Sequence, residues 1–162
     1  SEARGELERI IRVFPNVLYL RVIYPIMYGQ HPKCFLRKCI SRKNTIHDVS
    51  VPVTVIPALV PNLLKMMVNK YTGIMNFANR GLVSLDRLMG IAKKYFSHDL
   101  EWAVDGSTNR KVFELSTTRL ASFGNVQDPE TALETMFSEL KPEEKANWAA
   151  VIDSSMANSL KN

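Results

Sequence analysis

The side chains best suited to chemistry in this chain are a run of cations, three histidines and two cysteines. The cations gather early in the chain, at Arg37, Lys38, Arg42 and Lys43. Such a cluster suits a phosphate or pyrophosphate group, but a solvated helix face explains the same residues more simply. Aromatic side chains that would stack on bases are not interleaved with these cations, so we expect no nucleic-acid binding.

The histidines and cysteines lack the spacing of a metal site. His31, His47 and His98 are scattered, and Cys34 and Cys39 stand five residues apart without a CxxC pair. Zinc sites and disulfide frameworks need closer, repeated ligand patterns, so we expect no metal and treat the histidines as surface residues. Two thiols of this kind fit a reducing compartment inside the cell, either the cytoplasm or an organelle such as the mitochondrion.

Glycine spacing gives no sign of a phosphate-binding loop. The seven glycines never form GxGxxG, and neither a P-loop nor a GxSxG elbow is present. Taken alone, the residues of this chain therefore indicate no catalytic centre.

Length and composition are those of one ordinary globular domain. The chain has 162 residues, of which 46% are hydrophobic and 23% are charged, with a net charge of +5. Its longest apolar stretch, residues 49–60, is interrupted by Pro52 and Pro57 and is too short to span a bilayer. Because Ser1 is not an initiator methionine and helical sequence begins at once, we expect the natural start to lie upstream.

The first two elements are predicted to be a helix and a buried strand. Residues 2–14 place an apolar stripe on one helix face, formed by Leu7, Ile10, Ile11 and Phe14. Residues 17–24, VLYLRVIY, are β-branched, aromatic and nearly all apolar, which favours a strand buried on both faces of a parallel sheet. Pro25 is predicted to end that strand.

Helices and strands alternate through the rest of the chain. Helices are predicted at 32–43, 58–71, 85–95, 116–122, 129–140 and 143–160, and Ser84 is predicted to cap the third of them. Short strands are predicted at 45–47, 52–56, 73–79 and 101–104. This alternation indicates an α/β fold that contains part of a parallel sheet.

The last helix could serve either its own domain or another protein. Trp148, Ile152, Met156 and Leu160 recur every four residues and form a narrow apolar stripe. The stripe could dock on the domain formed by residues 1–140, or it could bind a partner in the manner of a helix in a groove. We therefore divide the chain into residues 1–140 and an extra C-terminal helix at 141–162.

Three segments together resemble a known family. They are ELERIIRVFPNVLYLRVIYPI at 6–26, IMNFANRGLVSLDRLMGIAKKYF at 74–96 and RKVFELSTTRL at 110–120. In colinear order over roughly residues 1–140, they are similar to the C-terminal half of extended short-chain dehydrogenase/reductases, and most of all to dTDP-4-dehydrorhamnose reductase and the nucleotide-rhamnose synthases, which are epimerase/reductases.

This resemblance implies a fold and a set of ligands. The fold would be the C-terminal part of a Rossmann-like extended short-chain dehydrogenase/reductase, with a partial parallel sheet and a small substrate-binding helical lobe. The ligand would be a nucleotide sugar, and a missing N-terminal half would be the partner. NADP(H) is the cofactor of the full-length family, and none is expected for this fragment.

The resemblance also assigns roles to four residues. Pro25 would lie where the backbone approaches the nicotinamide and the sugar, or would simply terminate a strand. Arg110 would bind the diphosphate of the sugar nucleotide, or would be a solvated loop arginine. Phe35 and Lys38 would belong to the helix beyond the substrate pocket, or would be scaffold.

Departures from the family pattern leave two functions open. Arg4 occupies the position of the catalytic lysine, Pro57 replaces an acidic residue at a helix start, and Ser116 replaces an aspartate. The first hypothesis is the substrate-binding half of a reductase or epimerase/reductase acting on a dTDP- or UDP-4-keto-rhamnose, inactive as this fragment. The second is a degenerate, non-catalytic structural or regulatory subunit of a larger complex.

Overall fold

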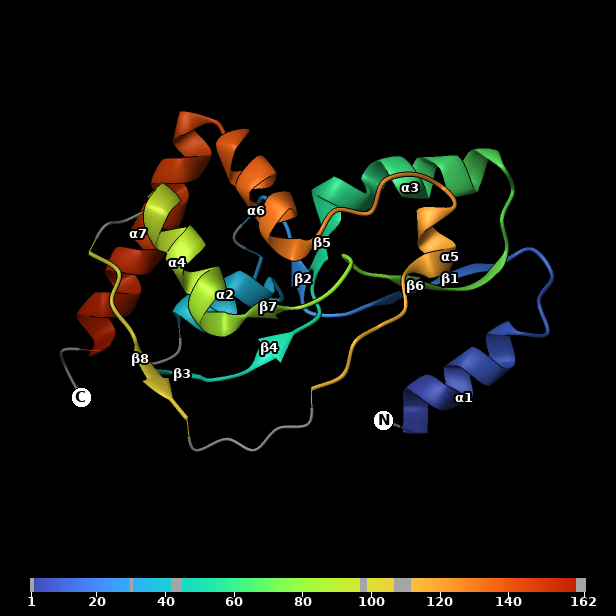
Figure 1. Cartoon of the computed structure of the whole chain (residues 1–162), viewed down its shortest axis with the longest axis horizontal. Coiled ribbons are helices and arrows are strands. Elements are labelled where there is room, and N and C mark those ends of the chain that lie inside the picture. Colours follow the sequence, from blue (N-terminus) through green and yellow to red (C-terminus); the bar gives the residue numbers. More distant parts are fainter. Residues whose placement is uncertain (1, 30, 42–44, 97–98, 107–111, 160–162) are drawn as a thin grey trace.

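The computed structural model describes residues 2–29, 31–41, 45–96, 99–106 and 112–159, apart from the side chains of residue 4 and residues 155–159. The helices are α1 (Glu2–Ile11), α2 (Phe35–Ile40), α3 (Ile56–Val68), α4 (Leu85–Phe96), α5 (Thr118–Ala121), α6 (Pro129–Ser138) and α7 (Pro142–Ser159). The strands are β1 (Leu18–Val22), β2 (Pro25–Ile26), β3 (Thr45–His47), β4 (Ser50–Val51), β5 (Thr54–Val55), β6 (Gly73–Phe77), β7 (Val83–Ser84) and β8 (Ala103–Asp105). Helices α2, α4, α6 and α7 gather at one end of the molecule, and α1 lies at the other (Figure 1).

Parallel pairing dominates the sheets, as the alternation of elements predicts. In the described part of the chain, β1 pairs with β6, β2 with β5 and β3 with β8, all parallel, whereas β4 and β7 pair antiparallel. The longest ladder runs from Leu18 opposite Gly73 to Val22 opposite Phe77. A parallel pair needs a long crossover, and α3 lies within the one that joins β1 to β6. The predicted α/β fold with a partial parallel sheet is thus confirmed.

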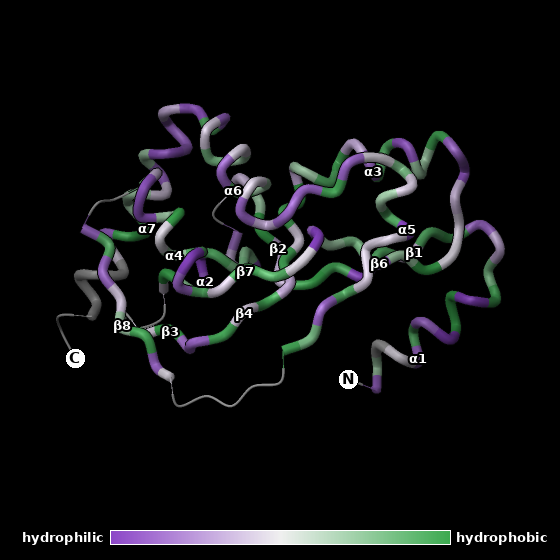
Figure 2. The backbone as a smooth tube through the Cα atoms, in the orientation of Figure 1, coloured by the Kyte–Doolittle hydropathy of each residue, from purple (hydrophilic) through white to green (hydrophobic). Residues whose placement is uncertain are grey.

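Two hydrophobic clusters hold these elements together. The larger lies among α2, α4, α6 and α7 and includes the fully buried side chains of Leu88, Phe137 and Trp148. The smaller joins α3, β6 and α5 through Leu59, Met75 and Leu120. Apolar and hydrophilic residues alternate along helices such as α3 and α4 (Figure 2), as expected for helices with one packed face.

The predicted cap of α4 is present in the structure. Ser84 lies directly before the helix, and its Oγ accepts a hydrogen bond of 3.0 Å from the backbone N–H of Arg87. Its hydroxyl thereby satisfies one of the N–H groups that have no partner within the helix. Because capping depends on neighbours in sequence, it could be predicted without the fold.

The apolar stripe of α1 is open, and the expected burial of β1 on both faces is wrong for this chain. Leu7 and Ile10 of α1 are 46% and 57% exposed, so the apolar stripe of the helix faces solvent. On β1, Arg21 and Val22 are exposed, and the three preceding residues are only half-buried. The physical reason is that α1 lies away from the two clusters, and that β1 pairs with β6 alone among the described strands. An apolar pattern shows that a face tends to be covered, but it does not show what covers it.

Pro25 begins a strand instead of ending one. The extended run stops at Val22, and Tyr24 adopts a backbone φ of 42°. Pro25 then opens β2, where it lies opposite Thr54 of β5. Because a proline has no N–H to donate to a ladder, it is tolerated at the first residue of so short a strand.

Helix α7 packs on its own chain. Trp148 and Ile152 have no exposed surface and belong to the larger hydrophobic cluster. Trp148 also donates a hydrogen bond of 3.0 Å from Nε1 to the carbonyl oxygen of Tyr28. These two side chains are therefore unavailable to a partner protein, and the intramolecular alternative holds for them. Met156 and Leu160, the other members of the predicted stripe, lie outside the described side chains.

Asp128 caps helix α6, and its contribution to stability can be measured. Its carboxylate accepts hydrogen bonds from the hydroxyl and the backbone N–H of Thr131, which hold the pKa of Asp128 below its usual value. We expect Asp128→Ala to lower the free energy of unfolding by about 1 kcal/mol at neutral pH. A carboxyl whose pKa is lowered in the folded state stabilises the fold fully at pH values above its unfolded pKa, about 3.9 for an aspartate. This contribution is lost as the pH falls through the folded pKa.

Urea unfolding at a series of pH values measures this difference. The stability gap between wild type and Asp128→Ala should narrow on acidification, and Asp128→Asn, which keeps an acceptor oxygen, should lose less than the alanine variant at neutral pH. A gap that stays constant down to pH values below the folded pKa would contradict a role for the carboxylate charge.

In the part of the chain that the structure describes, no helix combines the length and the apolar character needed to cross a membrane.

Candidate functional site

The carboxyl ends of β1 and β6 lie side by side, which is where ligands bind in open α/β sheets. Directly after β1, Tyr24 has a left-handed backbone, a conformation that costs a residue with a Cβ roughly 1–2 kcal/mol. Its ring packs against Phe35 of α2 with 4.4 Å between ring centroids. Strained backbone of this kind tends to mark functional sites.

A buried hydroxyl holds the end of β1 in place. Thr54 Oγ1 accepts a hydrogen bond of 3.1 Å from the backbone N–H of Ile23 and donates one of 2.7 Å to the carbonyl oxygen of Phe77. Thr54 has no exposed surface. One side chain on β5 thereby joins the ends of β1 and β6, and it fixes the backbone that leads into Tyr24.

The buried side-chain amide of Asn79 likewise joins neighbouring segments, at the turn that follows β6. Asn79 Oδ1 accepts a hydrogen bond of 2.8 Å from the N–H of Val55, and Nδ2 donates one of 3.2 Å to the carbonyl oxygen of Gln127. The backbone N–H of Asn79 donates to the carbonyl oxygen of Val53 at 3.0 Å. The turn after β6 is thus tied both to β5 and to the segment before α6.

Three of the predicted site residues meet in one cavity at this strand end. Pro25, Phe35 and Lys38 line a volume of about 400 Å³, which we call the outer cavity. Its remaining lining residues are Val22, Ile23, Tyr24, Lys33 and Phe113. The outer cavity therefore combines two ammonium groups with three aromatic rings and the backbone that follows β1.

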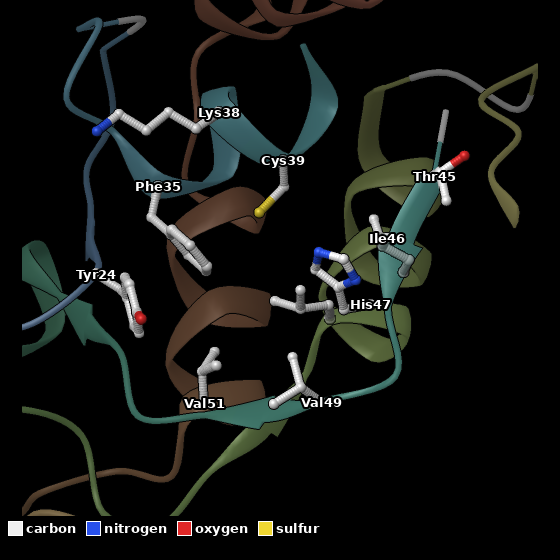
Figure 3. Close-up of a pocket in the computed structure, with 10 residues that line it drawn as sticks. Tyr24, Phe35, Lys38, Cys39, Thr45, Ile46, His47, Val49 and Val51 are labelled. Atoms are coloured by element: carbon white, nitrogen blue, oxygen red, sulfur yellow. The ribbon is translucent and has the colours of Figure 1, made fainter. Parts of the chain in front are cut away.

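A second hollow, the inner cavity, lies against the same aromatic pair. It measures about 250 Å³ and shares Tyr24, Phe35 and Lys38 with the outer cavity. Its other lining residues are Cys39, Thr45, Ile46, His47, Val49, Val51 and Leu85. Figure 3 shows Phe35, Cys39 and His47 pointing into it, whereas the Lys38 chain extends away toward its rim.

Two predicted site residues cannot be placed. Arg110, predicted to bind a diphosphate, lies outside the described residues, and so does the side chain of Arg4. Pro57 is at the start of α3, within its first turn, where a proline is favoured because its missing N–H would have no helical partner. Ser116 accepts a hydrogen bond of 3.0 Å at its carbonyl oxygen from Asn76 Nδ2.

Sequence reasoning missed the groups that shape this site. Thr54, Asn79 and Tyr24 were not singled out as functional residues. Thr54 and Asn79 act over 23 to 48 residues of sequence, so their partners depend on the sheet topology. Tyr24 offered one signal, because a residue before proline is restricted in its backbone.

Among the described residues, no group of three His, Cys, Asp or Glu side chains is arranged to hold a metal ion.

No family model matches the chain. Two proteins of Arabidopsis thaliana are similar in sequence. A trifunctional UDP-glucose 4,6-dehydratase/UDP-4-keto-6-deoxy-D-glucose 3,5-epimerase/UDP-4-keto-L-rhamnose-reductase is 33% identical over 104 residues, which are 64% of this chain and 16% of that protein. A bifunctional dTDP-4-dehydrorhamnose 3,5-epimerase/dTDP-4-dehydrorhamnose reductase is 28% identical over 141 residues, 86% of this chain and 45% of that protein. The chain thus matches less than half the length of either relative.

Two solved structures share the fold. The UDP-rhamnose synthase of Acanthamoeba polyphaga mimivirus superposes with a TM-score of 0.73 at 27% identity, over 86% of this chain and 52% of that one. RMD from Pseudomonas aeruginosa, solved with NADPH, gives a TM-score of 0.60 at 13% identity, over 97% of this chain and 55% of that one. In sequence this chain is similar to part of the rhamnose synthases and dTDP-4-dehydrorhamnose reductases, and its fold is that of the C-terminal part of an extended short-chain dehydrogenase/reductase.

Proposed function

We propose that the outer cavity binds a nucleotide sugar, and that this chain provides the substrate side of a rhamnose-forming reductase. The observation that carries the proposal is the convergence of Pro25, Phe35 and Lys38 in one cavity after β1. Its volume of about 400 Å³ falls in the usual range for small-molecule sites, roughly 300–1,000 Å³. The related proteins from Arabidopsis, which carry UDP- and dTDP-sugar reductase names, indicate the class of ligand.

The chemistry of the lining residues suits such a ligand. The ammonium groups of Lys33 and Lys38 can neutralise a diphosphate, which carries negative charge at neutral pH. The faces of Phe35, Phe113 and Tyr24 can pack on a base or on the apolar face of a deoxysugar. Arg110 remains a proposed diphosphate ligand, because a guanidinium can bind two phosphate oxygens at once.

The same lining fits a dinucleotide cofactor poorly. NADP(H) requires a glycine-rich turn that lets backbone N–H groups approach its pyrophosphate, and the cavity wall contains lysines and aromatic side chains instead. The chain carries no such turn. The outer cavity is therefore proposed to hold the sugar nucleotide and not the dinucleotide.

The exposed apolar side chains of α1 and α3 support the proposal that a further N-terminal half packs on this chain. Leu7, Ile10 and Phe14 lie open on and beyond α1, and Leu64 and Met67 lie open on α3. Monomeric proteins seldom leave apolar side chains grouped in this way without a partner surface. The mimivirus synthase extends over nearly twice the matched length. We propose that an N-terminal half covers these surfaces and contributes the cofactor site.

Calorimetric titration with UDP-rhamnose tests the proposal on this chain. We expect Lys38→Gln to raise the Kd about tenfold, because a hydrogen bond to a charged group contributes roughly 1.5 kcal/mol. Phe35→Ala should weaken binding through loss of the aromatic face. Arg110→Ala should also weaken it, and an unchanged Kd would remove Arg110 from the site.

Lys141→Gln is the matched control. Lys141 is exposed and lines neither cavity. Lys141→Gln removes the same charge as Lys38→Gln, so the Kd of this variant for UDP-rhamnose should equal that of the wild type. If both variants bound UDP-rhamnose equally weakly, the loss of affinity would come from the lower net charge and not from a contact with Lys38. Absence of binding by the wild-type chain at millimolar UDP-rhamnose would overturn the proposal.

A further inference from the structure

The inner cavity brings a thiol and an imidazole to facing walls. Cys39 comes from α2 and His47 from β3, and Figure 3 shows both side chains projecting into the space between them. Cys39 is 6% exposed and lines the cavity of about 250 Å³. Neither residue belongs to the lining of the outer cavity.

A carboxylate on the neighbouring strand lies beside the imidazole. His47 lies opposite Asp105 in the parallel pair of β3 and β8, and Nδ1 of the histidine is 3.5 Å from Oδ2 of the aspartate. A backbone hydrogen bond of 3.0 Å from Asp48 N–H to the Asp105 carbonyl oxygen continues the pairing. A carboxylate beside Nδ1 favours the proton on that nitrogen, and a base positioned by a third group is the usual arrangement for activating a thiol.

We propose that Cys39 is a modification site that undergoes exchange with a small, uncharged disulfide, with His47 as its base and Asp105 as the residue that positions the base. Phe35, Val49 and Val51 give the inner cavity an apolar and aromatic wall. The Lys38 chain extends away from Cys39 and His47 (Figure 3), which favours an uncharged reagent over an anionic one. The site does not depend on binding of a nucleotide sugar.

The thiol and the disulfide are the only reactants that the exchange needs. His47 takes the thiol proton, and the thiolate sulfur of Cys39 attacks one sulfur of the disulfide. A new S–S bond forms as the old one breaks, so Cys39 is oxidised and the departing sulfur is reduced. That sulfur leaves as a thiolate and takes the proton from the imidazolium, which restores the base.

Cys34 provides an internal control for burial. It stands five residues earlier, at the N-cap of α2, and is fully buried. It lines neither cavity. The two thiols therefore share a helix and a low exposure but differ in the cavity and in the histidine.

Reaction of the folded chain with 4,4′-dithiodipyridine, followed by the absorbance of released thiopyridone, tests the site. Trypsin separates the two cysteines into peptides 34–37 and 39–42, so quenched samples report each thiol by mass. We expect Cys39 to react at least ten times faster than Cys34 in the folded chain, and at a similar rate in denaturant. Equal rates in the folded chain, or a faster Cys34, would overturn the assignment.

Two variants test the role of the base. His47→Gln and Asp105→Asn should each slow the Cys39 reaction severalfold while the rate at Cys34 stays unchanged, and circular dichroism checks that both variants fold. An unchanged Cys39 rate in folded His47→Gln would show that the imidazole does not activate the thiol and would refute the proposal. Should either variant unfold, the ratio of the two rates in the folded wild-type chain still decides which thiol is reactive.

Discussion

Trp148→Ala is expected to lower the free energy of unfolding by about 3–5 kcal/mol, the usual range for truncating a large buried aromatic residue. The indole has no exposed surface and stacks on Phe96 with 5.4 Å between ring centroids. Its Nε1 also donates to the carbonyl oxygen of Tyr28, which would lose its partner. Urea unfolding followed by far-ultraviolet circular dichroism measures the loss.

Trp102 is the matched control, because it is the other of the two tryptophans in the chain. It is half-buried, with one hydrogen bond of 2.9 Å to Asp86, so Trp102→Ala should cost clearly less. Trp148→Phe should retain much of the packing and lose mainly the hydrogen bond, about 1 kcal/mol. If α7 melted in a separate transition with the rest of the chain unchanged, residues 141–162 would be an independent unit and the prediction would be wrong.

The second large effect is expected at Asn79. Asn79→Ala removes two side-chain hydrogen bonds at a residue that is 1% exposed, and leaves the N–H of Val55 and the carbonyl oxygen of Gln127 without their partner. Each buried polar group left unsatisfied costs about 1–3 kcal/mol, so the total loss of stability should be about 3 kcal/mol. Hydrogen exchange by NMR should show lost protection of the Val55 amide in the same variant.

Asn76 offers a control of the same residue type on β6. Its side chain also makes two hydrogen bonds, with Arg21 and with the carbonyl oxygen of Ser116, but it is only half-buried. Water can replace those bonds, so Asn76→Ala should cost less than 1 kcal/mol. A loss at Asn76 equal to or greater than that at Asn79 would show that burial does not decide the effect.

Apolar spacing and capping residues predicted the positions of α4 and β3 well, because both depend on residues that are close in sequence. The helix that follows Ser84 was predicted at 85–95 and spans Leu85–Phe96, and its inner residues Leu88 and Ile91 are buried. The short strand predicted at 45–47 is β3. Apolar spacing and capping act within a few residues, and a sequence displays them directly.

The site required information that a linear pattern does not contain. The three residues Pro25, Phe35 and Lys38 were singled out from a family resemblance, and only the fold shows that they line a common cavity. Thr54 and Asn79 depend on which strands become neighbours. Burial of β1 on both faces was predicted wrongly because an apolar run records a tendency to be covered and does not show which element covers it.

The hydrogen bond between Trp148 and Tyr28 joins residues that are 120 positions apart, and this separation has a consequence for synthesis on the ribosome. At about 5–20 residues per second, roughly 6–24 s pass between the emergence of the two partners. During that interval α2 can form first and α4 later, but their common core cannot close. We therefore expect nascent chains to depend on chaperones until the last helix has left the exit tunnel, and shortened chains without α7 to be degraded.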